Sequence, residues 1–455
     1  MIHRALLLAL VGWLLAGVVL LTVYRANQVD APRASMHSND FKHLWIGARL
    51  IHLGESPYDE SHLFDMAASH RLGGINPYVY LPFTGLVMTP VTQRSFPEAV
   101  RRWFWISHAA IVLAIALAAV HVTWGARLWA AGFLAALGLL FAAEMMPLTR
   151  QFTAGQLNCV LAFVLVVILI SVERRWLWLA GGAIAFATLF KLSPGIFLLW
   201  ILWKRAWRLL TWTGVWLAVF LAWSLLQVGL RVHLEFWPLL REMRIGHSTW
   251  AHHGMAYHVD AFNQSMGAFL LHAFAGEGGT QAWLNLGPAI ANALTVLFAL
   301  GVLACLIFVT RRGWERDGLP AETWRAEWAM LVCASLLIPS LLWDHYAVQL
   351  LPVLVVGLWS VLTRPPPSLS MRIAAAVLWA AAVFLLTVPV PHGAESLRSG
   401  LGLVVMSARL WGVLLVFGLV FGLCLWSQRR CLCHEAPTAS PPEEPTNATD
   451  APRHA

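Results

Sequence analysis

The chain has 455 residues, of which 59% are hydrophobic and only 12% are charged. This balance excludes an ordinary soluble domain, in which about 25% of residues are charged. The 25 tryptophans are typical of a protein whose indole rings lie at lipid headgroups. The formal net charge of +8 falls in short Arg and Lys clusters between apolar segments, so it reflects membrane topology, and nucleic acid is not an expected partner.

About ten separate apolar segments long enough to cross a bilayer follow one another along the chain. The first covers Ala5 to Tyr24 and the last covers Leu410 to Trp426. In hydrocarbon each segment must satisfy its own backbone hydrogen bonds, and continuous apolar stretches do not match the alternating pattern of a barrel. The predicted fold class is therefore all-α: a polytopic integral membrane protein with about 10–12 transmembrane helices.

Basic clusters, such as Lys204 to Arg208, mark the cytoplasmic turns and fix the opposite side as the outer face. The predicted organisation is a first transmembrane helix (1–24), an outer loop (25–79), a transmembrane bundle (80–230), a second outer loop (231–282), a second bundle (283–427) and a disordered cytoplasmic tail (428–455). We expect a multi-pass protein of the inner (plasma) membrane with its active site facing the periplasm or outside.

Two segments stay open at this stage. Tyr80 to Thr92 is short for a span and either crosses the membrane or re-enters it. In the tail, Cys431, Cys433 and His434 could bind metal or carry a lipid, although a loose tail with reduced thiols is the simpler interpretation.

The first outer loop contains a stretch, Ser38 to Asp59, whose apolar residues recur at helical spacing. The pattern predicts an amphipathic helix lying on the outer leaflet. Asn39 and Asp40 open this helix, and the plain interpretation is that one of them caps it.

Further polar residues interrupt the apolar segments on the expected outer side. They are Gln156 and Asn158 in GQLN, Lys191 in KLSP, Asn263 and Gln264 in FNQSMGAFL, and Asp344 and His345 in WDHY. A lysine at a helix centre costs roughly 2.5–3.5 kcal/mol, so Lys191 either snorkels, faces a cavity or meets an anion. Asp344 and His345 are functional candidates or simply the polar turn of a helical hairpin.

The second outer loop is rich in histidine, which raises the question of a metal site. His252 and His253 are adjacent, however, and neighbouring side chains point apart on most backbones. The loop has neither HExxH nor another compact ligand set. The sequence therefore predicts no metal ligands.

Together these motifs resemble glycosyltransferase family 87 over almost the whole chain. The matching elements are Asp40, Phe41 and Trp45, then Gly54, Glu55, Pro57 and Tyr58 with Ser56 inserted, Tyr80 to Pro82, Gly155 to Asn158, Lys191 with Pro194, Asn263 to Ser265, and Trp343 to Tyr346. The closing element keeps only the first of the two histidines of that family, His345. This departure weakens any role that needs a histidine pair.

The resemblance implies a fold of the GT-C type and transfer of a hexose, mannose in the best-known members, from a polyprenyl-phosphate-sugar donor to a lipid or glycan acceptor. It implies that Asp40 is the general base and that Lys191 and His345 stabilise the leaving phosphate. Neutral or acidic groups that would bind donor phosphate or sugar are Gln156, Asn158, Asn263, Gln264 and Asp344. A DxD element is absent, which suits a lipid-phosphate donor, so we expect no cofactor and no required metal.

Two other classes of protein remain open. A secondary transporter also has many helices and ionisable groups at depth, although no internal repeat supports it here. A lipid-linked oligosaccharide ligase or polymerase would share the outer-face chemistry, and Arg231, Arg241 and Arg244 in the second outer loop fit that class.

Overall fold

A computed structural model describes residues 12, 15–126, 128–311, 314, 319–363 and 368–434, with the side chains of residues 128 and 426–434 left aside. Within these residues the chain forms helices and loops, and its one β-type pairing is an isolated antiparallel bridge between Asn263 and Trp343. The all-α fold predicted from the apolar segments is confirmed.

The helices begin and end as follows. They are α2 (Ala31–Ala34), α3 (Asn39–His52), α4 (Glu60–Ser69), α5 (Pro82–Thr92), α6 (Phe96–Val122), α7 (Leu128–Glu144), α8 (Met146–Ala154), α9 (Asn158–Glu173), α10 (Leu177–Phe190), α11 (Ile196–Trp203), α12 (Trp207–Val228), α13 (Leu230–Glu242), α14 (Met266–Ala275), α15 (Pro288–Val309), α16 (Ala321–Leu337), α17 (Leu351–Thr363), α18 (Leu369–Thr387), α19 (Gly402–Met406) and α20 (Ala408–His434). A π-helical turn, Arg25–Asp30, precedes α2, and a 3-10 turn, Asp344–Leu350, runs into α17.

Among the described residues six helices are long and apolar enough to cross a membrane, and the protein is a multi-pass membrane protein. They are α6, α12, α15, the continuous segment Asp344–Thr363, α18 and α20 up to Leu425. The pair α7 and α8, bent by 68°, brings the number to seven. The predicted 10–12 spans are reached only by adding the shorter apolar helices α9, α10 and α11 and the first segment. Part of that segment, residues 5–11, 13 and 14, lies outside the described residues.

The long helices differ in how much of their surface the protein covers. α12, α15 and α18 expose large apolar side chains, among them Val219, Leu297 and Phe384. α9 and α16 are instead buried along most of their length. Exposed apolar surface of this kind faces lipid in a membrane protein, so α9 and α16 form the interior of the bundle.

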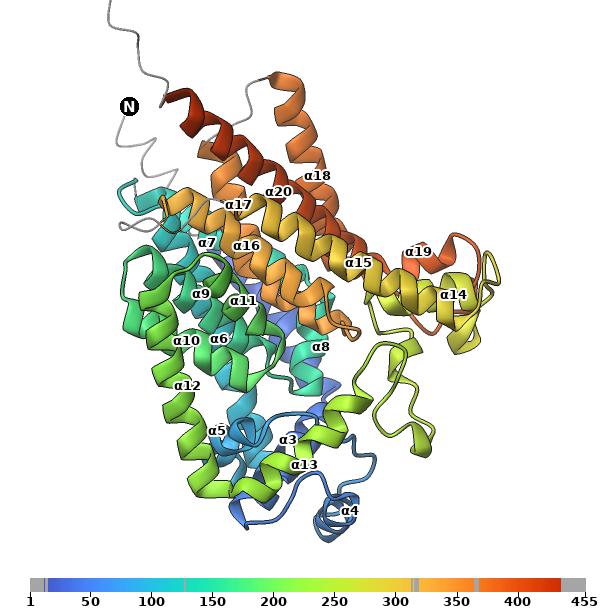
Figure 1. Ribbon diagram of the computed structural model, residues 1–455. Coiled ribbons are helices and arrows are strands. Elements are labelled where there is room, and N and C mark those ends of the chain that lie inside the picture. Colours follow the sequence, from blue (N-terminus) through green and yellow to red (C-terminus); the bar gives the residue numbers. More distant parts are fainter. Residues whose placement is uncertain are drawn as a thin grey trace, which may run out of the picture.

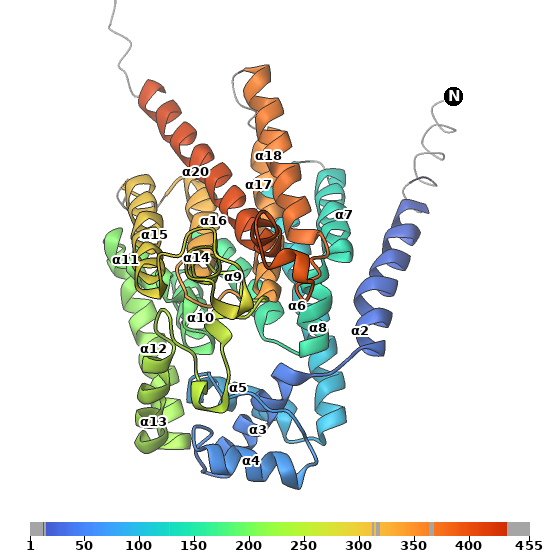
Figure 2. The same cartoon turned by 90° about the vertical axis from the view of Figure 1, so that its right-hand side faces the viewer.

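The first outer loop and α13 gather at one end of the bundle. Figures 1 and 2 place α3, α4 and α13 at that end, and the start of α18 and the end of α20 at the opposite end. α20 continues to His434, beyond the predicted end of the second bundle, while the rest of the predicted tail, 435–455, lies outside the described residues.

The amphipathic helix predicted in the first loop exists as α3, and protein covers both of its faces. Its apolar stripe is buried as predicted, and Ile46 and Leu50 on its other side are also at most 1% exposed. α3 packs against α4, α5, α6 and α8. Gly47 permits the closest approach, because a Cβ there would lie 2.2 Å from the Tyr78 ring. The helix is therefore enclosed by protein.

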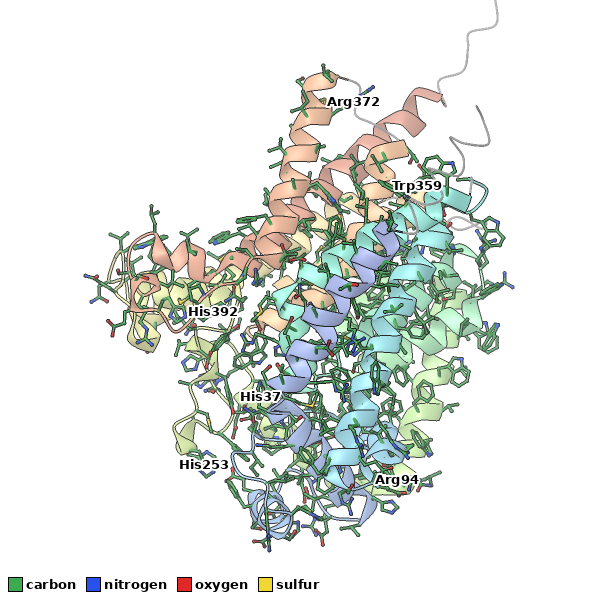
Figure 3. The ribbon with its side chains drawn as sticks, turned by 180° about the vertical axis from the view of Figure 1, so that it is seen from behind. His37, Arg94, His253, Trp359, Arg372 and His392 are labelled. Carbon is green, nitrogen blue, oxygen red and sulfur yellow. The ribbon has the colours of Figure 1, made fainter. Side chains whose placement is uncertain are left out.

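The open question about Tyr80 to Thr92 is answered by α5. Its 11 residues rise about 1.5 Å each and cannot cross a hydrocarbon core of about 30 Å. Its far end stays beside α3, since Trp45 and Arg49 both donate hydrogen bonds to the carbonyl of Arg94. Figure 3 shows Arg94 at the same end as His253, with Trp359 and Arg372 at the opposite end. α5 is therefore too short to span the membrane.

A buried ion pair ties α11 to α16. Lys204 Nζ lies 2.7 Å from Glu327 Oε1, and both side chains are 0% exposed. Trp200 donates its indole N–H to the other Glu327 oxygen at 2.8 Å. The pair compensates two desolvated charges, so loss of either partner leaves an uncompensated buried charge.

We predict that Glu327→Ala lowers the free energy of unfolding by about 3–5 kcal/mol, because it leaves Lys204 buried without its carboxylate. The apparent unfolding temperature in detergent or nanodiscs measures this. The control is Glu98→Ala, which removes a partly exposed pair with Arg102 and should cost no more than about 0.5 kcal/mol. Equal melting of the two variants would contradict the prediction.

Candidate active site

A cavity of about 470 Å³ opens beside α3, between the end of α10, α11 and α16. Its polar lining includes Asp40, His43, Asn76, Tyr80, Gln156, Lys191, Ser193, Thr249, Tyr257, Ser335, Ser340, Trp343 and Tyr346. Three of the residues selected from the sequence, Asp40, Gln156 and Lys191, therefore share one cavity although more than 110 residues separate the first two.

Asp40 lies in the first turn of α3 but does not cap it. The N-cap is Ser38, in a left-handed conformation, and no side chain closes the cap. Asp40 Oδ1 instead accepts a hydrogen bond from Asn76 Nδ2 at 3.3 Å. In the described part of the chain it forms no salt bridge, which leaves acceptor positions on a partly buried carboxylate that faces a cavity.

A second contact orients the Asn76 amide from the other outer loop. The Tyr257 hydroxyl donates to Asn76 Oδ1 at 3.2 Å. Burial, followed by the negative charges of Asp40 and Asp260, raises the pKa of Tyr257 to about 12. The phenol therefore stays protonated at neutral pH and continues to donate. The chain from Tyr257 through Asn76 to Asp40 fixes the direction of the carboxylate.

His43 is a site residue that the sequence interpretation missed. It is 3% exposed, lines the cavity and stacks on Tyr80 at a centroid distance of 5.9 Å, and neither ring nitrogen has a hydrogen-bond partner. Burial lowers the pKa of His43, with the charge of Asp40 acting in the opposite direction. His43 follows Asp40 by three residues and so lies on the same face of the helix. This spacing was the sequence signal that could have identified His43 as a site residue.

Lys191 is held at the cavity from two sides. Its Nζ donates to Asn158 Oδ1 at 2.8 Å and lies 3.2 Å from the centroid of the Tyr346 ring. Asn158 is 0% exposed, and its Oδ1 also accepts from Gln349 Nε2 at 3.0 Å. Its own amide group donates to Gln151 Oε1 at 2.9 Å. Asn158 therefore anchors the lysine from behind the cavity wall.

The neighbouring Gly155 packs against α3, and Gln156 forms a hydrogen bond with Tyr80. Gly155 has φ +78°, and a Cβ there would lie 2.6 Å from Cβ of Phe41, so only glycine allows α3 to approach. Gln156 Oε1 accepts a hydrogen bond from the Tyr80 hydroxyl at 2.9 Å. The GQLN motif thus links α3, Tyr80 and Lys191 in one place.

Asn263 and Gln264 form hydrogen bonds with backbone groups instead of facing the cavity. Asn263 Oδ1 accepts from the amides of Ser265 and Leu342, and its Nδ2 donates to the Ser340 carbonyl at 3.2 Å. Gln264 Nε2 donates to the carbonyl of Met406 at 2.9 Å. The Asn263 contacts, with the Gln264 backbone amide that donates to the Leu342 carbonyl, hold segment 340–344, whose Ser340, Leu341 and Trp343 line the cavity.

Asp344 is the last residue of this segment and His345 follows it, and neither side chain lines the cavity. Asp344 Oδ2 accepts from Arg150 at 2.6 Å, which ties the segment to α8. His345 Nδ1 lies 3.5 Å from the other Asp344 oxygen, and its Nε2 has no partner. Both side chains are buried, and it is their neighbours Trp343 and Tyr346 that line the cavity.

Comparison with known proteins identifies the family. Residues 78–343 match the sequence model of Glycosyltransferase family 87, which is more than half of the chain. The chain belongs to glycosyltransferase family 87. The resemblance inferred from the short motifs is confirmed, and the protein is a glycosyltransferase.

Two curated proteins that are similar to this family 87 member carry the same name, "Polyprenol-phosphate-mannose-dependent alpha-(1-2)-phosphatidylinositol mannoside mannosyltransferase". The protein from Mycolicibacterium smegmatis is 28% identical over 69% of this chain and 72% of its own length. The protein from Mycobacterium tuberculosis is 29% identical over 76% of this chain and 75% of its own length.

Among solved structures, the chain is similar to ArnT from Cupriavidus metallidurans bound to undecaprenyl phosphate. The sequence identity is 17% and the TM-score 0.43, over 91% of this chain and 78% of that one. The apo form of the same protein gives a TM-score of 0.39. At these TM-scores the similarity supports no conclusion about the site.

We predict that Asn263→Ala loosens segment 338–346 without unfolding the bundle. The substitution leaves the buried amide of Leu342 unpaired, at a cost of about 1–3 kcal/mol, so hydrogen exchange there should accelerate about tenfold or more. Exchange measured by mass spectrometry tests this. Asn39→Ala is the control, because the Asn39 side chain accepts only from the exposed Lys42. Unchanged exchange over 338–346 would contradict the role assigned to Asn263.

Proposed function

We propose that this family 87 enzyme transfers a hexose, specifically mannose, from a polyprenyl-phosphate-linked donor to a lipid or glycan acceptor, with inversion at the anomeric carbon. The observation that carries the proposal is that a carboxylate, Asp40, and a cation, Lys191, line one cavity that also has an apolar wall. The names of the two mycobacterial relatives support the donor and favour a phosphatidylinositol mannoside as one acceptor class.

In the proposed step Asp40 removes the proton of the acceptor hydroxyl as its oxygen attacks the anomeric carbon. The new carbon–oxygen bond forms while the bond from the anomeric carbon to the phosphate oxygen breaks. The electron pair leaves with the polyprenyl phosphate, which changes from a singly charged diester to a monoester dianion. Asp40 ends the step protonated, so charge and protons balance.

Lys191 is suited to stabilise the charge that grows on the leaving phosphate. Asn158 and the face of Tyr346 hold its ammonium in place before substrate arrives, so little reorganisation is needed during the reaction. In this proposal Asn158 positions the ammonium group of Lys191. Gln156 positions Tyr80 in the same way.

His43 is suited to bind a hydroxyl of the sugar or of the acceptor. As a neutral imidazole it offers one donor and one acceptor, and neither ring nitrogen meets the criteria for a hydrogen bond with any described residue. An unpaired buried polar group costs about 1–3 kcal/mol, which a bound hydroxyl would recover. The proximity to Asp40 favours the acceptor side of the cavity.

The isoprenoid chain would lie along the apolar wall. Leu192 and Leu199 both line the cavity and are 42% and 57% exposed at the surface of the protein, with Ile196 between them. A chain leaving the cavity there would enter lipid directly. The donor phosphate would then remain beside Lys191.

We place the cavity on the outer face of the plasma membrane, periplasmic in a bacterium with two membranes. The basic turns of the sequence support this side, and the two long loops meet at the end of the bundle that holds α3 and α13 (Figure 1). In this proposal Asn263, Gln264, Asp344 and His345 act by holding the cavity wall at residues 340–346.

We predict that Asp40→Asn lowers the transfer rate at least about 100-fold, since a general base contributes 10²–10⁴-fold, while donor binding stays unchanged. Transfer from radiolabelled polyprenyl-phosphate mannose to a lipid acceptor extract in nanodiscs measures the effect. Binding of the same donor, measured in parallel, separates chemistry from affinity.

Asp59→Asn is the matched control for Asp40→Asn. Asp59 lies in the same loop and caps α4 by accepting from the Ser61 amide, a role that asparagine also fills. It should transfer at the wild-type rate. Full activity of Asp40→Asn would remove Asp40 from catalysis. Absence of transfer by the wild type from any polyprenyl-phosphate hexose would contradict the proposed reaction and favour transport.

We predict that Lys191→Gln weakens binding of polyprenyl phosphate about 10–100-fold, because a hydrogen bond to a charged group contributes about 1.5–3 kcal/mol. Asn158→Ala should weaken binding in the same direction but less, since the charge stays and only its anchor is lost. Competition against the labelled donor measures both. Lys42→Gln, which removes an exposed lysine bound to the Gly73 carbonyl, should bind like the wild type. Unaltered binding by Lys191→Gln would refute the phosphate role.

A further inference from the structure

Glu60, His252 and His253 meet where the two outer loops touch. Glu60 is the first residue of α4, and the histidines belong to the 3-10 turn Ala251–His253. His252 Nε2 lies 2.9 Å from Glu60 Oε1, and His253 Nε2 lies 2.8 Å from Glu60 Oε2. One carboxylate thus receives two imidazoles from a loop almost 200 residues away.

The expectation that adjacent histidines point apart is wrong in this turn. Trp250, with φ 58°, and Gly254, with φ 78°, bracket the turn in left-handed conformations, which bend the backbone sharply. Trp250 is buried and stacks on Phe64 of α4 at a centroid distance of 5.5 Å, and His253 packs edgewise on the same ring at 5.7 Å. Packing on α4 therefore turns both imidazoles toward Glu60.

The three side chains have the composition and spacing of a transition-metal site. Their ligand atoms all lie within 4.8 Å of one another. Two imidazole nitrogens and one carboxylate oxygen are ligands that zinc prefers, at about 2.0–2.2 Å, which separates ligands of a tetrahedral ion by roughly 3.3 Å. To admit such an ion, the two histidine–carboxylate contacts would open by about half an ångström, and the widest ligand separation would close by up to about 1.5 Å.

The partial exposure of the cluster also suits a metal ion. His252, His253 and Glu60 have side-chain exposures of 58%, 36% and 35%, so an ion can enter from solvent. The two imidazole rings lie with their centroids 4.3 Å apart, close enough for one ion to bind both rings in their neutral form.

We propose that Glu60, His252 and His253 bind one divalent transition-metal ion of the zinc type, which cross-links α4 to the second outer loop. Water completes the coordination. The same loop carries Thr249 and Tyr257, which line the cavity, so the ion steadies one cavity wall. Figure 3 shows His253 on this loop at the end of the molecule that holds α4. The ion has no part in the transfer step, and the site does not depend on which sugar is transferred.

The experiment is zinc titration of the full-length protein in nanodiscs, purified with a tag free of histidine and treated with a chelator. The background carries Cys431→Ser, Cys433→Ser and His434→Ala, which remove the other candidate ligands in the tail. We expect one zinc per chain with micromolar or tighter affinity by calorimetry, and slower hydrogen exchange over residues 248–254 when zinc is present.

Two variants test the ligands directly. His252→Ala combined with His253→Ala should weaken zinc binding at least 100-fold and abolish the protection of residues 248–254. His247→Ala, in the same loop but outside the cluster, should bind like the background. Asp40→Asn should also bind zinc normally, which separates this site from the catalytic one. No stoichiometric binding by the background protein, or undiminished binding by the double variant, would overturn the proposal.

Discussion

The hydrogen bond from Lys191 to Asn158 is the interaction around which the cavity is built. It places a cation at the broken junction between α10 and α11, where an unpaired ammonium would be costly beside lipid. Asn158 can hold it only because Gln151 and Gln349 occupy the remaining positions of its amide. Four polar side chains from α8, α9, the α10–α11 junction and the 3-10 turn before α17 therefore share one buried network, and those elements fix the cavity wall together.

Asp40 depends on a different set of contacts. α3 can approach the cavity only because Gly155 has no side chain, and the carboxylate is then directed by Asn76 and Tyr257. The Asp40 carboxylate and the Lys191 ammonium are thus held by separate networks that converge on one cavity. Such separation lets each group keep its own charge, since Asp40 forms no salt bridge in the described residues that would neutralise it.

The sequence predicted the all-α fold because apolar length is a local signal, whereas the grouping of Asp40, Gln156 and Lys191 at one site was implied by the resemblance to family 87. It could not predict that α3 is enclosed, since an apolar stripe says nothing about what covers the opposite face. Nor could it show that Asn263 binds the backbone of Leu342. His43 was missed because a lone histidine in an apolar helix stands out only once its unpaired nitrogens are known.

The second outer loop joins the two proposals physically. It runs from the turn that holds His252 and His253, through Tyr257, to Asn263 and the bridge with Trp343. At one end it touches α4, in the middle it orients Asn76 and so Asp40, and at the other end it holds a wall of the cavity. A clamp on the first contact therefore restricts the loop that directs the base. In the proposed mechanism this loop aims the Asp40 carboxylate at the acceptor hydroxyl, so the order of the whole loop matters there more than any single hydrogen bond within it.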